Sequence, residues 1–81
     1  MRVTVSFFSY FKELTGCAQT MAELAEGSTL GDLQKQLCSR FPKLSGLEAS
    51  TLAAVGYEYQ QRTCVLKEGD QVSLFPPVQG G

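Results

Sequence analysis

The sequence predicts one α+β domain, in which a mixed β-sheet packs against a single main helix. Three observations predict this class: the chain has only 81 residues, segments near both ends alternate apolar and polar residues, and a helical period occurs between them. A chain of this length buries one modest core, so two independent domains are excluded.

The chain begins with an alternating segment over residues 1–8, which is typical of a half-buried strand. One side of this strand is apolar and consists of Val3, Val5 and Phe7. Residues 9–14 are expected to form a helical turn that stops at Gly16. A second strand at about residues 18–24 then completes an N-terminal hairpin with a wide loop.

The strongest helix signal covers residues 30–40. Ser28 or Thr29 can cap this helix, and Thr29 and Asp32 have the spacing of a capping box, with Asp in the place usually held by Glu. The apolar residues that follow recur at helical spacing and line one face: Leu30, Leu33, Leu37 and Phe41. Pro42 disfavours helical backbone at the residue before it, so we expect the helix to end near residue 40.

Three further strands are expected after the helix. Residues 52–55 predict a buried strand that ends at Gly56, and residues 62–65 predict a short edge strand. Residues 67–70 form a turn, and residues 71–75 alternate again. In this last strand Val72 and Leu74 face inward, whereas Ser73 and Phe75 face outward.

The order of these elements favours a sheet whose first and last strands lie side by side in parallel. One sheet then grips the single long helix, which is the β-grasp architecture. We expect the β-grasp domain to cover residues 1–75 and residues 76–81 to form an extended tail.

Composition excludes several classes of function. The formal net charge is −1 and the seven Lys and Arg residues are scattered, which argues against binding to nucleic acid or to an anionic membrane. No apolar run approaches the roughly 20 residues that a membrane helix needs. The N-terminus lacks a signal-peptide pattern, so we expect a cytoplasmic protein.

The cysteines do not have the spacing of a metal site. Cys17, Cys38 and Cys64 are far apart, and the chain has no His, so no metal is expected. We interpret them as reduced thiols packed like small apolar side chains. The alternative is that one of them relays sulfur, which no neighbouring residue indicates.

The most informative segment is the C-terminal one, Phe75-Pro76-Pro77-Val78-Gln79-Gly80-Gly81. Its two prolines favour a stiff, extended path away from the sheet. Gly80 and Gly81 carry no side chain, so this end can enter a channel too narrow for other residues. The six residues from Pro76 reach roughly 20 Å at ~3.3 Å per residue. Such a stem is suited to delivering a carboxylate into another protein's active site, the alternative being a frayed terminus.

Five segments together resemble one known family: Val5-x-Phe7-Phe8, Lys12-Glu13-Leu14-Thr15-Gly16, Leu52-Ala53-Ala54-Val55, Gly69-Asp70-x-Val72 and Phe75-Pro76-Pro77-Val78-x-Gly80-Gly81. The chain is similar over nearly its whole length to the small subunits of molybdopterin synthase, which are ubiquitin-like sulfur carriers. Carriers for thiamin synthesis and tRNA thiolation share the Gly-Gly end but are less similar at the Pro-Pro-Val step.

The resemblance implies a carrier mechanism centred on Gly81, with Gly80 beside it. An activating enzyme related to ubiquitin E1 would use ATP to adenylate the C-terminal carboxylate, and a persulfide-derived sulfur would replace AMP to leave a thiocarboxylate. The tail would insert into the synthase large subunit, within a heterotetramer of two small and two large subunits. There it would donate sulfur to cyclic pyranopterin monophosphate, forming the molybdopterin dithiolene. The chain alone would be non-catalytic and would bind no cofactor of its own.

Strand alternation also predicts a partner surface. Phe8 and Phe75 should lie together on the sheet face opposite the helix, and exposed aromatic rings often mark contacts with a partner. The alternative is that a ring packs beneath a loop. The resemblance adds Tyr59 to this surface, and the tail residues expected to contact the partner are Pro76, Pro77 and Val78.

Three functions remain open at this point. The chain is a molybdopterin synthase carrier, a sulfur carrier of another pathway, or a ubiquitin-like modifier that becomes linked to lysines of target proteins. All three need a free Gly-Gly end, and the Pro-Pro-Val stem favours the first.

Overall fold

The computed structural model describes residues 1–77 and has five strands, two α-helices and two short 3-10 turns. The predicted site residues Val78, Gly80 and Gly81 lie outside the described residues. The elements are β1 (Arg2–Phe7), α1 (Phe11–Thr15), β2 (Gln19–Glu23), α2 (Leu30–Arg40), η1 (Pro42–Leu44), η2 (Glu48–Ser50), β3 (Leu52–Val55), β4 (Glu58–Tyr59) and β5 (Gln71–Phe75).

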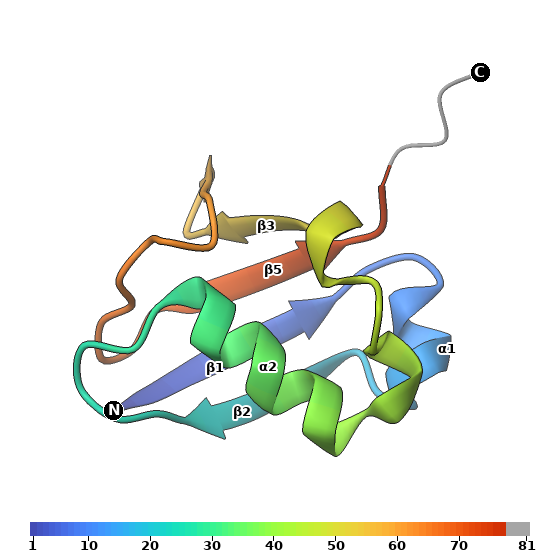
Figure 1. The fold of residues 1–81 in the computed structure, drawn as a ribbon, viewed down its shortest axis with the longest axis horizontal. Coiled ribbons are helices and arrows are strands. Elements are labelled where there is room, and N and C mark those ends of the chain that lie inside the picture. Colours follow the sequence, from blue (N-terminus) through green and yellow to red (C-terminus); the bar gives the residue numbers. More distant parts are fainter. Residues whose placement is uncertain (78–81) are drawn as a thin grey trace.

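The strands form one mixed sheet in the order β2-β1-β5-β3-β4, and α2 lies across one face of it (Figure 1). The first and last strands, β1 and β5, pair in parallel at the centre, with Val5 beside Val72. All other neighbouring strands are antiparallel. The parallel central pair and the single gripped helix confirm the predicted ubiquitin-like β-grasp fold.

The core lies between α2 and the facing side of the sheet. Its largest fully buried side chains are Phe7, Phe11, Leu30, Leu33, Leu37, Val3, Val5 and Val72. This set includes the predicted inward side of β1 and three of the four residues of the predicted helix face. The fourth, Phe41, is partly buried and sets its ring edge-on against Phe7, with centroids 5.7 Å apart.

The predicted capping box begins α2. The Thr29 side chain accepts a hydrogen bond from the Asp32 N–H at 3.2 Å, and the Asp32 carboxylate accepts one from the Thr29 N–H at 2.9 Å. Two N–H groups that have no partner inside the helix are thereby satisfied. Hydrogen bonds from the Thr29 backbone and side chain also lower the pKa of Asp32.

The prediction of an edge strand at residues 62–65 was wrong. The short edge strand is β4, Glu58–Tyr59, where Tyr59 pairs with Ala54 of β3. Gly56 has a φ of 63°, a value that glycine adopts without steric strain. The chain therefore turns back directly after β3, and β4 pairs with β3.

Residues 62–65 instead lie beside the N-terminal end of α2. The Arg62 carbonyl accepts a hydrogen bond from the Gly31 N–H at 2.9 Å, and Val65 forms an isolated bridge with Thr29. N–H groups at the start of α2 donate to carbonyl groups of this segment, so the segment supports α2 and does not extend the sheet. Within residues 1–77, none of the helices has both the length and the apolarity to cross a membrane.

Candidate functional site

The candidate site surrounds the point where the chain leaves the sheet. β5 ends at Phe75, and the half-buried Pro76 and Pro77 follow it. Neither proline has an N–H, so neither extends the strand ladder. This end of β5 lies on the same side of the domain as α1, away from the N-terminus (Figure 1).

Three aromatic side chains, Phe8, Tyr59 and Phe75, form a cluster at this position, which we call the aromatic cluster. The Phe8 and Phe75 rings stack, with centroids 4.6 Å apart and planes inclined by 17°. The Tyr59 ring lies 6.1 Å from that of Phe75 at 59°. Phe8 and Tyr59 are exposed and Phe75 is half-buried. The rings that the sequence placed together therefore do lie together, on the face away from α2.

Four strands hold the aromatic cluster in place. The Phe8 N–H donates to the Leu74 carbonyl at 3.2 Å, which extends the pairing of β1 and β5 beyond the last residue of β1. On the other side of β5, Phe75 pairs with Leu52 of β3, and β4 places Tyr59 beside the same strand. Backbone pairing between strands thus positions the residues that carry the three rings.

Sequence reasoning missed Leu52 as part of this surface. Its side chain is exposed and its backbone pairs with Phe75, so it extends the apolar surface beside the aromatic cluster. The whole strand Leu52–Val55 is apolar, and a period of two was therefore invisible in it. Only the register with β5 shows which residues of β3 face away from α2.

The part of the sheet face next to the aromatic cluster is lined by side chains that carry no charge. A shallow hollow of about 350 Å³ extends from Phe75 and Tyr59 along this face, and hydroxyl and amide side chains line much of it. The lining includes Ser6, Ser73 and Gln71. Burial of aromatic rings and hydrogen bonding, more than charge, would therefore stabilise a complex at this face.

The side chains of Cys17, Cys38 and Cys64 lie at the margin of the core. All three thiols are free and pack partly buried against the core. Burial, together with the neighbouring Glu48 carboxylate, raises the pKa of Cys38 to about 11. A thiol with this pKa stays protonated at neutral pH and is a poor nucleophile. Within residues 1–77, no group of three or more His, Cys, Asp or Glu side chains could hold a metal ion.

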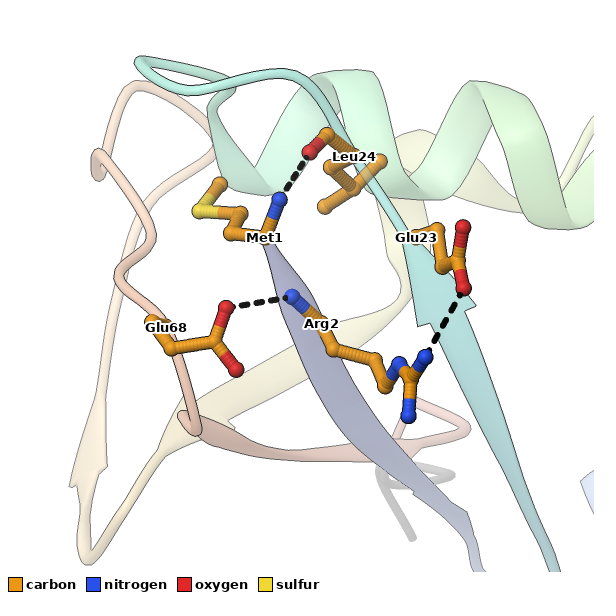
Figure 2. Close-up of a pocket in the computed structure, with 5 residues that line it drawn as sticks. All are labelled: Met1, Arg2, Glu23, Leu24 and Glu68. Carbon is orange, nitrogen blue, oxygen red and sulfur yellow. Dashed lines mark hydrogen bonds and ion pairs between the residues drawn. The ribbon is translucent and has the colours of Figure 1, made fainter.

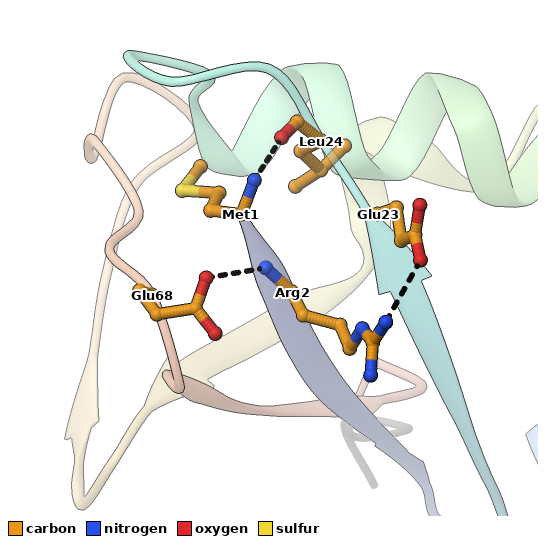
Figure 3. Close-up of polar contacts among 5 residues, drawn as sticks. All are labelled: Met1, Arg2, Glu23, Leu24 and Glu68. Atoms are coloured by element: carbon orange, nitrogen blue, oxygen red, sulfur yellow. Dashed lines mark hydrogen bonds and ion pairs between the residues drawn. The ribbon is translucent and has the colours of Figure 1, made fainter.

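A wider hollow of about 560 Å³ lies at the start of β1 (Figure 2). Its polar groups contact one another (Figure 3): the Met1 ammonium donates to the Leu24 carbonyl, and the Arg2 N–H donates to Glu68 at 3.0 Å. The Arg2 guanidinium also pairs with Glu23 at 3.3 Å, where both side chains are exposed. Exposed pairs of this kind contribute about 0–1 kcal/mol. We interpret this hollow as a structural junction between β1, β2 and the turn before β5.

Comparison with known proteins finds matches that cover nearly the whole chain. Residues 5–81 match the model of the ThiS family. A molybdopterin synthase sulfur carrier subunit from Chlamydomonas reinhardtii is 31% identical, over 100% of both chains. A small archaeal modifier protein 3 from Haloferax volcanii is 28% identical, also over 100% of both.

Solved structures of similar chains also match over nearly the whole length. A putative molybdopterin converting factor subunit 1 from Pyrococcus furiosus is 31% identical with a TM-score of 0.89, covering 96% of this chain and 99% of that one. A chain in the complex of subunits 1 and 2 of the molybdopterin-converting factor from Helicobacter pylori is 27% identical with a TM-score of 0.70, covering 100% of both.

Proposed function

Because this chain belongs to the ThiS family of ubiquitin-like sulfur carriers, we propose that it is the sulfur-carrier subunit of a molybdopterin synthase. The observation that carries the proposal is the aromatic cluster at the exact end of β5 where the Pro76-Pro77 stem begins. The names of the Chlamydomonas and Pyrococcus relatives support the same pathway.

In this proposal the reacting group is the carboxylate of Gly81. A carboxylate is a poor electrophile, so an E1-like activating enzyme first transfers AMP from ATP to it and releases pyrophosphate. The carbonyl carbon then carries a good leaving group. A persulfide sulfur displaces AMP, a thiol cleaves the remaining S–S bond, and Gly81 is left as a thiocarboxylate.

The thiocarboxylate sulfur is then donated to cyclic pyranopterin monophosphate in the active site of the large subunit. Each transfer moves one sulfur atom to the substrate, and an oxygen from water restores the carboxylate. Two transfers complete the dithiolene of molybdopterin. This chain contributes the nucleophile and its delivery, since Gly80 and Gly81 present no side chain to the channel, and the large subunit contributes the substrate pocket.

The partner surface follows from the same geometry. We propose that Phe8, Tyr59 and Phe75 contact the large subunit while Pro76, Pro77 and Val78 guide the tail into it. The Helicobacter structure, a complex of two converting-factor subunits, supports a partner of this kind. We further propose an assembly of two small and two large subunits.

A second candidate function has one specific observation in its favour. The Haloferax relative is called a small archaeal modifier protein and matches over the full length of both chains. In that function a lysine amine would attack the acyl-adenylate at Gly81, form an amide and displace AMP. Activation is common to both candidates, so the step after adenylation separates them.

Intact-mass measurement tests the proposal. The chain is incubated with an E1-like activating enzyme, ATP and a persulfide donor, and then with the large subunit and cyclic pyranopterin monophosphate. We expect the mass gain of one oxygen replaced by sulfur, followed by its loss as molybdopterin forms. A chain that lacks Gly81 serves as the control and should show neither change. Amide-linked conjugates without thiocarboxylate would contradict the carrier function and support the modifier.

A further inference from the structure

β2 is an edge strand, and among residues 1–77 no other strand pairs with its outer side. Its inner side pairs with β1, as shown by the hydrogen bonds from the Phe7 N–H to Ala18 and from the Leu24 N–H to Met1, both 2.8 Å. Backbone groups alternate between the two sides of a strand. The N–H and carbonyl groups of Gln19, Met21 and Glu23 therefore point outward.

Two side chains of α2 occupy this outer edge. Arg40 donates to the Met21 carbonyl at 2.9 Å and to the Thr20 hydroxyl at 2.8 Å. Gln36 donates to the Glu23 carbonyl at 2.8 Å. Two of the three outward carbonyls are therefore already paired within the chain.

The spacing of the two donors matches that of the two acceptors. Gln36 and Arg40 are four residues apart on α2, a rise of about 6 Å. The Met21 and Glu23 carbonyls are two residues apart on β2, a separation of roughly 7 Å. α2 lies over β1 and β2 in the ribbon view, so both donors reach the edge from the same helix (Figure 1).

Arg40 is also tied to the core. Its guanidinium carbon lies 5.1 Å from the centre of the Phe41 ring, and Phe41 packs edge-on against the buried Phe7. A guanidinium over an aromatic face is attracted to it. Although Arg40 is exposed, it is therefore held over the strand edge by contacts on two sides.

We propose that the outer edge of β2 is a pairing surface for a second copy of this chain, and that Gln36 and Arg40 keep it closed. Unprotected edge strands pair readily with other chains. An antiparallel pair of β2 strands centred on Met21 would set Gln19 opposite Glu23 and Thr20 opposite Ala22. No like charges would then face each other, and the exposed Met21 side chain would meet its own copy.

Sedimentation equilibrium of the double variant Gln36→Ala/Arg40→Ala tests this inference. We expect the parent chain to be monomeric and the variant to dimerise at the same concentration. Hydrogen exchange gives a second readout: the N–H groups of Gln19, Met21 and Glu23 should exchange fast in the parent and become protected in the variant. The inference is overturned if the variant stays monomeric with unprotected edge amides.

Two further variants isolate the edge from general effects. Lys43→Ala/Gln61→Ala removes one exposed cation and one exposed amide elsewhere on the surface, so it should remain monomeric. Adding Met21→Lys to the Gln36→Ala/Arg40→Ala variant places like charges opposite each other in the proposed pair and should restore the monomer. A dimer that survives Met21→Lys would show that another surface forms it and would reject the proposal.

Discussion

Phe8 and Phe75 lie far apart in the sequence, yet their rings stack with centroids 4.6 Å apart. The parallel pairing of β1 with β5 sets Phe7 beside Leu74 and so brings the next residue of each strand together. The residue that follows the first strand therefore contributes a ring to the surface at the end of the last strand. The tail begins at this same point. In the proposed function, this one pairing would couple docking to delivery of the C-terminus.

Replacing Phe75 by Ala should weaken binding to the large subunit while changing the thermal unfolding midpoint little. Aromatic anchors at the centre of an interface commonly contribute about 2 kcal/mol or more, which corresponds to a loss of at least ~30-fold in affinity. Titration calorimetry and thermal unfolding measure the two effects.

Phe7→Ala is the matched control, because Phe7 is the neighbouring ring on the opposite, buried face and is only 2% exposed. Its loss should cost about 3–5 kcal/mol of unfolding free energy. If Phe75→Ala destabilised the fold as strongly as Phe7→Ala, the partner role of Phe75 would be wrong.

Deleting Gly81, or adding one residue after it, should abolish sulfur transfer and leave the fold intact. The reacting carboxylate would then stand at the wrong distance from the stem, whereas the last buried core residue among residues 1–77 is Leu74. Product formation with the large subunit measures the first effect, and circular dichroism measures the second. An extended chain that is unprocessed by mass spectrometry and still produces molybdopterin would refute the carrier mechanism.

Changing Gly80 to Val should block activation or transfer without altering thermal unfolding. A branched side chain would obstruct a narrow channel and remove the backbone freedom of glycine. Gln79→Val is a suitable control, since that position already carries a side chain. Thiocarboxylate yield and molybdopterin yield are the readouts, and parent-like values of both for Gly80→Val would contradict the steric argument.

Cys38 should be alkylated slowly at pH 8 in the folded chain and quickly in denaturant. Burial and the Glu48 carboxylate raise the pKa of Cys38 from 9.0 to about 11. The folded chain thus keeps a proton that the unfolded chain loses between about pH 9 and 11, so the free energy of unfolding should fall as the pH rises through this window. Peptide mass spectrometry across a pH series follows the alkylation.

Glu48→Gln separates the two causes of that pKa. It removes the negative charge beside the thiol but leaves the thiol buried, so the pKa of Cys38 should fall only part of the way to its usual value. The alkylation profile should shift to lower pH accordingly. An unchanged profile would show that burial alone raises the pKa.

Several features of this protein follow from local sequence. The alternation at residues 1–8 and 71–75 shows which side of each strand is apolar, and the Thr29 and Asp32 pair marks the start of α2. These signals need only neighbouring residues, because side-chain direction repeats with the period of the element. The narrowness of the end at Gly80 and Gly81 is equally local, since it depends on the absence of side chains, whereas the sulfur chemistry proposed for Gly81 rests on the resemblance to a family.

Tertiary structure alone decided the remaining features. A two-residue strand such as β4 has no period to detect, and its position depends on the turn at Gly56. Only its register with Phe75 places Leu52 beside the aromatic cluster. Arg40 covers the edge of β2 because α2 crosses above it. Pairing between strands, and between a helix and a strand edge, is determined by hydrogen bonds between distant segments, and a local pattern does not contain that information.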